Sequence, residues 1–167
     1  MSPNPMDFAQ FYAESKDVCL RAVLVGVGDL DTAQDLVDEA FARAWASWRK
    51  VRSHPAPQAW VVRVALNAGV SAWRRAPRER PVAGDGMAGL PDTAGVDLGD
   101  GIVAGDIMAA LKRLPLRQRQ VVAFRVFLDM DTANAARALG MAPGTVRAHL
   151  ARAIATLRHE FAIEERG

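Results

Sequence analysis

Apolar residues recur every three or four positions along most of this chain, which is the spacing of one face of an α-helix. Segments that alternate apolar and polar residues, as half-buried strands do, are almost absent. The helical pattern is lost only between about residues 81 and 105. We therefore predict an all-α protein of two small helical domains joined by a flexible linker.

Three helices are predicted in residues 1–80. The first runs from Pro5 to Val25, and the third from about Gln58 to Arg75. The second begins near Asp31, whose carboxylate can cap the free amides of the first turn. Its apolar positions define one buried face: Leu36, Val37, Ala40, Phe41, Ala44, Trp45 and Trp48.

Four more helices are predicted after the linker, at residues 102–114, 116–127, 132–139 and 143 to about 160. Pro115 separates the first two, and Gly140 supplies a tight turn before the last. The final two helices and this turn make a helix-turn-helix, a motif that places its second helix in the major groove of DNA. The domain at residues 106–167 is therefore a candidate DNA-binding unit.

Residues 81–105 are predicted to form the linker. They hold seven of the 13 glycines, two prolines and no aromatic residue, so they cannot bury enough apolar surface to offset the cost of ordering. Their charged residues are all acidic: Asp85, Asp92, Asp97 and Asp100. The chain's net charge of +2 hides this segment. Residues 1–80 carry 11 basic and 9 acidic side chains, and residues 106–167 carry 10 basic and 6 acidic, which favours a polyanionic partner.

Several classes of protein are excluded by what the chain lacks. The single cysteine, Cys19, cannot form an intramolecular disulfide or a Cys-rich zinc site, and the three histidines show no ligand spacing. No apolar run approaches the roughly 20 residues of a membrane span, and no signal-peptide pattern is present. Paired carboxylates, a catalytic triad and a phosphate-binding loop are missing too. We expect a cytoplasmic protein that needs no metal or cofactor and is not an enzyme.

The last helix carries the candidate DNA-reading residues. Its apolar stripe would face the domain: Val146, Leu150, Ala153, Ile154 and Leu157. Arg152 lies on the opposite face, flanked by Arg147 and His149. An arginine in this position can bond a guanine edge or neutralise a phosphate, and Thr145 at the helix start can help hold a phosphate. The alternative is a solvated basic face on an ordinary helical hairpin.

The third helix combines aromatic and basic residues. Small and apolar side chains form one face: Val61, Ala65, Ala68 and Ala72. The other side carries a polar set in which arginines adjoin tryptophans: Trp60, Arg63, Asn67, Ser71, Trp73, Arg74 and Arg75. Such a surface suits unpaired bases, which stack on aromatic rings while arginines contact the backbone. Tryptophans that belong to the core, with merely solvated arginines, remain the alternative.

Acidic residues crowd the start of the second helix at Asp35, Asp38 and Glu39. Carboxylates there complement the helix dipole, or they form a protein-binding surface beside the apolar stripe. Their spacing leaves both interpretations open.

Four segments together resemble the extracytoplasmic-function (ECF) sigma factors of bacterial RNA polymerase. They are Asp35–Trp45, Trp60–Asn67 with Trp73–Arg75, Leu114–Arg119, and Gly144–Ala153. The resemblance covers roughly residues 5–80 and 104–161, in the order of the family and with its linker. It departs from the family at Asn134-Ala135-Ala136, at Ala142 where a capping Ser is customary, and at His149 where Arg is common.

The resemblance implies a division of roles between the two domains. Residues 1–80 would bind the clamp helices of the largest polymerase subunit through Asp35, Asp38, Glu39 and Ala42. The same domain would open the minus-ten element with Trp60, Arg63, Asn67, Trp73, Arg74 and Arg75. Residues 106–167 would meet the polymerase flap and read the minus-thirty-five element with Thr145, Arg147, His149 and Arg152. An anti-sigma factor is an expected further partner.

Two other functions compete with this one. A helix-turn-helix regulator could act as a dimer without polymerase, but it would need a self-association helix for which few residues follow Glu160. A helical adaptor could instead use its basic surfaces to bind acidic proteins. Binding to core polymerase separates both from a sigma factor.

Overall fold

The computed structural model describes the backbone of residues 5–75 and 105–166, and the side chains of residues 7–70 and 105–162. These residues form helices and contain no strand, which confirms the all-α prediction. The N-terminal part comprises α1 (Pro5–Val27), α2 (Leu30–Ala46), α3 (Trp48–Arg52) and α4 (Pro57–Arg75). The C-terminal part comprises α5 (Gly105–Lys112), α6 (Leu116–Val122), the π-helical turn η1 (Ala123–Phe127), α7 (Thr132–Leu139) and α8 (Pro143–Arg166).

Helices α1, α2 and α4 pack against one another and build the core of the N-terminal part. The approach of α1 to α4 is close at Gly26, where an added Cβ would lie 2.5 Å from Cδ2 of Leu66. Aromatic rings fill the other end of this core. The ring centroid of Phe11 lies 5.8 Å from that of Phe41 and 5.1 Å from that of Trp48. The small side chains of Ala59 and Ala65 on α4 are buried in the same core.

The second helix departs from its prediction at both ends. Its cap is Asp29 and not Asp31, because the backbone amide of Thr32 donates to the Asp29 carboxylate at 3.0 Å. Asp31 is exposed within the first turn. The helix ends at Ala46, so Trp48 belongs to α3, and Trp45 is not part of the buried face because 45% of its surface is exposed.

The C-terminal part contains the predicted helix-turn-helix. Helix α7 has the bounds predicted for it and is capped by Asp131, whose carboxylate accepts from the amide of Asn134 at 2.7 Å. Gly140 ends α7 in the left-handed region, with φ of +66°, and α8 begins at Pro143. Helix α8 extends past residue 160, and the predicted helix at 116–127 changes to π-helical hydrogen bonding at Ala123.

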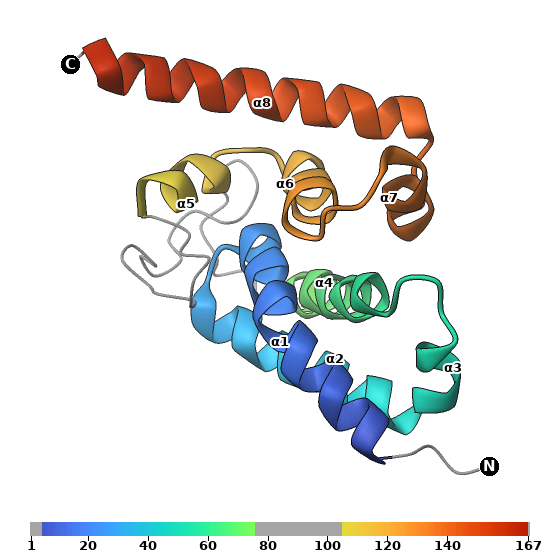
Figure 1. The fold of residues 1–167 in the computed structure, drawn as a ribbon. Helices are drawn as coiled ribbons and strands as arrows, with labels where there is room; N and C mark the ends of the chain where they lie inside the picture. The colour runs from blue at the N-terminus through green and yellow to red at the C-terminus, as the bar shows by residue number, and fades with distance from the viewer. Residues whose placement is uncertain (1–4, 76–104, 167) are drawn as a thin grey trace.

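The two parts are in contact, which the sequence pattern does not predict. Helices α5 and α6 and the turn η1 pack on α1, while α7 packs on α4. Ala22 to Val25 on α1 are each at most 2% exposed, although four successive residues point in all directions around a helix. Figure 1 shows α1 and α4 beneath the C-terminal helices, with α8 farthest from the N-terminal part. The predicted linker lies outside the described residues, apart from Gly105 at the start of α5.

Candidate nucleic-acid and protein interfaces

The first turns of α8 present the basic surface expected of a recognition helix. Thr145, Arg147 and Arg152 are exposed, whereas Val146 and Ala153 are fully buried against the C-terminal part. Leu150 and Leu157 are half-buried, and Ile154, which the sequence places in the buried stripe, is 38% exposed. The helix therefore separates a packed face from an arginine-bearing face.

His149 differs from its basic neighbours on α8. It is half-buried, and its Nδ1 is shielded from solvent and has no hydrogen-bond partner among the described residues. Nδ1 is therefore not available to a ligand at the surface. At the helix start, the amides of Thr145 and Val146 both donate to the backbone oxygen of Ala142, at 3.0 and 3.1 Å. These are the first hydrogen bonds of the helix, and Ala142 has no side-chain acceptor that could cap the free amides of the first turn.

Helix α4 exposes a second polar face. Arg63 and Asn67 are exposed and Trp60 is half-buried, while Val61 and Ala65 face the core. Trp73, Arg74 and Arg75 occupy the last turn of α4, but their side chains lie outside the described residues, as do those of Ser71 and Ala72. The structure therefore places three of the six predicted minus-ten side chains.

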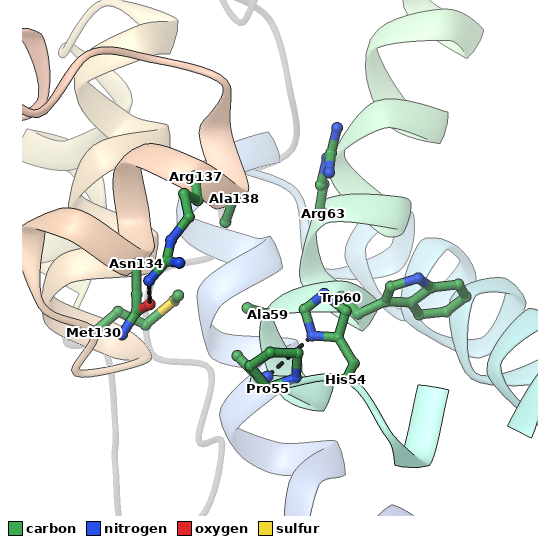
Figure 2. Close-up of a pocket in the computed structure, with 10 residues that line it drawn as sticks. His54, Pro55, Ala59, Trp60, Arg63, Met130, Asn134, Arg137 and Ala138 are labelled. Carbon is green, nitrogen blue, oxygen red and sulfur yellow. Dashed lines mark hydrogen bonds between the residues drawn. The ribbon is translucent and has the colours of Figure 1, made fainter. Parts of the chain in front are cut away.

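A crevice between α4 and α7 contains part of this face (Figure 2). It encloses about 170 Å³ and is lined from the N-terminal part by residues that include His54, Trp60 and Arg63. Asn134, Arg137 and Ala138 of α7 line the other side, where Nη2 of Arg137 donates to Oδ1 of Asn134 at 2.5 Å. Nδ1 of His54 accepts from the amide of Ala56 at 2.9 Å. The lining residues include two arginines and a histidine, but no carboxylate.

The outer face of α2 carries the predicted acidic surface. Asp35, Asp38 and Ala42 are exposed, and neither aspartate forms an ion pair with any residue that the structure describes. Glu39 is also exposed but pairs with Arg43, one helical turn later, at 2.7 Å. The charge of Glu39 is therefore partly neutralised by its own helix.

Trp45 is a surface residue that the sequence pattern assigned to the core. It follows Asp38 by seven residues and Ala42 by three, so it shares their side of α2. Its ring packs against Phe8 of α1, with 5.1 Å between centroids, and leaves the outer edge in solvent. Its spacing of three and seven residues from Ala42 and Asp38 could have placed Trp45 beside the acidic residues, but its apolar character placed it in the predicted buried face.

The recognition face and the acidic face lie far apart. Figure 1 shows α8 at one end of the molecule and α2 at the other, with α1 and α4 between them. Within residues 5–75 and 105–166, no helix is both long and apolar enough to cross a membrane.

Comparison with known proteins gives matches on both sides of residues 80–103. The family described as sigma-70 region 2 matches residues 14–79, and sigma-70 region 4 matches residues 104–157. The RNA polymerase sigma-E factor of Streptomyces coelicolor is 33% identical over 157 residues, which are 93% of this chain and 86% of that protein. The ECF RNA polymerase sigma factor SigL of Mycobacterium tuberculosis is 32% identical over 150 residues, 88% of this chain and 84% of that protein.

A solved structure has a similar fold. It is the sigma factor RpoE of Bartonella quintana in complex with the anti-sigma factor NepR. The TM-score is 0.79 with 22% sequence identity, and the match covers 94% of this chain and 98% of that one. The similarity extends over both helical parts and therefore includes their placement relative to each other.

Proposed function

The chain belongs to the ECF group of sigma-70-type RNA polymerase sigma factors, and we propose that its three exposed faces divide the work of transcription initiation. As a sigma factor it directs core RNA polymerase to promoters. The proposed domains are residues 1–80 for polymerase binding and minus-ten opening, a linker at 81–105, and residues 106–167 for the minus-thirty-five element. The matches at residues 14–79 and 104–157 support this division.

The minus-thirty-five element is assigned to α8. Arg147 and Arg152 are exposed on the second helix of a helix-turn-helix, which supports insertion of this helix into the major groove. Arginine bonds O6 and N7 of guanine or neutralises a phosphate, and Thr145 contributes a phosphate contact. His149 would donate or accept through Nε2 alone.

The minus-ten element is assigned to α4, with the face that includes Trp60, Arg63 and Asn67. An aromatic ring beside an exposed arginine supports binding of unpaired bases. Trp73, Arg74 and Arg75 extend this assignment by resemblance to the family.

Core polymerase is assigned to the outer face of α2, with Asp35, Asp38, Glu39 and Ala42. We add Trp45 to this face. Tryptophan anchors are enriched among the residues that dominate binding energy at protein interfaces, and the acidic residues beside it supply complementarity to a basic partner. The observation that carries the whole assignment is that the acidic face of α2 lies at the opposite end of the molecule from the arginine-bearing face of α8, because polymerase and DNA can then bind together.

Three further properties are proposed with this function. The chain is not itself an enzyme, and it works in the cytoplasm, where promoters and polymerase are found. An anti-sigma factor is a proposed partner, because the similar solved structure contains a sigma factor with one. The polymerase-independent regulator and the helical adaptor are not favoured, because the matches cover two sigma regions in order.

The test is transcription with the host's core polymerase. The purified chain, core polymerase and genomic DNA of the host should give transcripts with defined 5′ ends that core polymerase alone does not make. Failure of the chain to bind core polymerase would contradict the proposal.

Trp45→Ala tests the polymerase face. Truncating an interface anchor costs about 2 kcal/mol or more, so we expect core polymerase to bind about 30-fold more weakly. Tyr12→Ala is the matched control, because Tyr12 is an exposed aromatic residue that packs on Phe8, as Trp45 does, but belongs to α1 and is not assigned to the interface. Equal polymerase affinities of the two variants would remove Trp45 from the interface.

A further inference from the structure

Two cavities adjoin where the two helical parts meet. The crevice between α4 and α7, which we call the basic crevice, holds about 170 Å³. A second cavity of about 370 Å³, which we call the apolar cavity, lies beside it, because Pro55, Ala56, Ala59 and Met130 line both. Sites for small organic ligands span roughly 300–1,000 Å³, and the two cavities together reach that size. One small molecule can therefore occupy both.

The basic crevice carries positive charge that no carboxylate balances. Arg63 of α4 and Arg137 of α7 stand on opposite walls (Figure 2). Neither forms an ion pair with any residue whose side chain the structure describes. Arg137 donates to the neutral amide oxygen of Asn134, which orients its guanidinium without reducing its charge. An anion between the two arginines would be attracted by both.

His54 adds a third donor to the basic crevice. Its Nδ1 accepts from the backbone amide of Ala56 at 2.9 Å, so the hydrogen of the neutral ring is carried by Nε2, on the other side of the ring (Figure 2). The crevice is thus lined by N–H donors of two arginines and one histidine. A phosphate monoester offers three acceptor oxygens and up to about two negative charges, whereas a carboxylate offers two oxygens and one charge. The donor set therefore favours a phosphate group.

The second cavity suits an apolar group. Besides the shared residues, Phe11 of α1 and Leu128 of the connection before α7 line it. Its polar residues already have partners. Nε2 of Gln58 donates to Oγ of Ser15 at 3.1 Å, and the exposed carboxylate of Glu14 accepts a hydrogen bond from its own helix at 3.1 Å. A hydrocarbon group in this cavity would leave these bonds intact while it removes apolar surface from water.

The wall that both cavities share is fixed by hydrogen bonds. The amide of Met130 donates to the backbone oxygen of Phe124 at 3.1 Å, and Nη1 of Arg125 donates to the backbone oxygen of Met130. Asp129, just before Met130, has a φ of +52° and so makes a sharp turn. A wall held in place before binding lowers the entropy that a ligand must overcome.

We propose that the two cavities bind a small amphiphilic phosphate monoester. Its phosphate lies in the basic crevice between Arg63 and Arg137, and its apolar group lies in the apolar cavity. Because α4 and α7 each supply one of these arginines, the bound molecule also links the two helical parts. This site goes beyond the proposed function, and it needs neither DNA nor polymerase to bind its ligand.

The probe for this site is octyl phosphate, kept below the concentration at which it forms micelles. Isothermal titration calorimetry with the free chain should show one molecule bound per chain. Inorganic phosphate has only the head group and 1-octanol only the apolar group, so each should bind at least about tenfold more weakly. Octanoate should also bind about tenfold more weakly, because it has one charge and two oxygens.

Each of these ligands can contradict one part of the proposal. No saturable binding of octyl phosphate would overturn it as a whole. Equal binding of inorganic phosphate would remove the apolar cavity from the site, and equal binding of 1-octanol would remove the basic crevice. Equal binding of octanoate would overturn the choice of a phosphate head group.

Two pairs of variants locate the bound molecule. Arg137→Gln removes one charge from the crevice, and Arg158→Gln removes one from an exposed position of α8 outside both cavities. Ala138→Leu fills the crevice, whereas Ala133→Leu adds the same bulk at an exposed position of the same helix. Arg137→Gln and Ala138→Leu should each bind octyl phosphate about tenfold more weakly than their controls.

Equal affinities of Arg137→Gln and Arg158→Gln would show that only the net charge of the chain matters, and would overturn the proposed site. Circular dichroism verifies that each variant is folded. Arg137 is exposed, so Arg137→Gln keeps the test decisive even if Ala138→Leu does not fold.

Discussion

Both proposed DNA faces carry exposed arginines, but they lie on two helices with different neighbours. On α8, Arg147 and Arg152 point into solvent at the far end of the molecule. On α4, Arg63 is also exposed, but it lies with Trp60 beside a crevice whose other wall is α7. The composition of the two faces is similar, yet their surroundings are not. The surroundings of the α4 face are set by contacts between residues distant in sequence, whereas the exposed face of α8 follows from local sequence alone.

The largest effect expected from this difference is on binding of duplex DNA to the free chain. Arg147→Ala with Arg152→Ala removes two contacts worth about 1–3 kcal/mol each, so affinity for a duplex that carries the minus-thirty-five element should fall about 100-fold. Arg63→Ala should change it less than twofold, because Arg63 is assigned to unpaired bases of the minus-ten element and not to this duplex. Fluorescence anisotropy measures both, with a duplex taken from mapped start sites.

Arg158→Ala is the control for this comparison. Arg158 is exposed on α8 beyond the recognition segment, so its loss changes net charge without removing a proposed contact. Binding to core polymerase should be unaltered in all these variants. If Arg63→Ala weakened duplex binding by the free chain as much as the α8 pair, the two faces would be equally accessible and the comparison would fail.

Local sequence signals predicted the recognition unit well. Gly140 takes the left-handed conformation that ends α7, and Pro143 begins α8, as the pattern indicates. The cap of α7 at Asp131 was not predicted. Each of these signals acts within a few residues, so it needs no knowledge of the rest of the fold. The family resemblance likewise depended on local runs, and the comparisons confirm the family.

Contacts between distant segments were beyond the sequence pattern. The apolar run from Ala22 to Val27 is visible in the sequence, but nothing in it says that helices on both sides cover it. The prediction that Trp45 is buried was wrong. An aromatic residue at helical spacing fits a buried face, but 45% of the surface of Trp45 is exposed. Asp29 and Asp31 are equally good capping residues by type. Asp29 is the cap because its backbone is extended, whereas Asp31 already lies within the helix.

Two glycines, Gly26 in the core and Gly144 on the surface, allow a similar comparison of tightly packed and open positions. An alanine at Gly26 would place Cβ 2.5 Å from Leu66 in the tight packing of α1 on α4, and overpacking of this kind costs about 1–3 kcal/mol. An alanine at Gly144 meets only the end of the Arg147 side chain, at 3.9 Å, and favours the helix by up to about 1 kcal/mol. Urea denaturation should thus show Gly26→Ala destabilised and Gly144→Ala stabilised. A neutral Gly26→Ala would mean that Leu66 moves aside at little cost.

The last comparison is the reactivity of the Cys19 thiol in the folded and in the unfolded chain. Burial raises the pKa of the Cys19 thiol from 9.0 to about 12, and its Sγ lies 3.9 Å from the backbone oxygen of Gln58 on α4. Because the thiolate is the reactive form, the folded chain should react with a disulfide reagent at pH 8 far more slowly than the urea-unfolded chain. Cys19 faces the α1–α4 contact, so its reaction rate reports on that contact.

Ionisation of the Cys19 thiol also makes the stability of the fold depend on pH. Between about pH 9 and 12 the unfolded chain releases the Cys19 proton and the folded chain keeps it, so ionisation favours unfolding. The contribution of Cys19 to stability is therefore fully present below pH 9 and declines as pH rises through this window. Cys19→Ala should show a shallower loss of stability in denaturation at pH 8 and pH 10. An equal loss of stability in Cys19→Ala and in the unmodified chain would show that another group sets the pH dependence over this window.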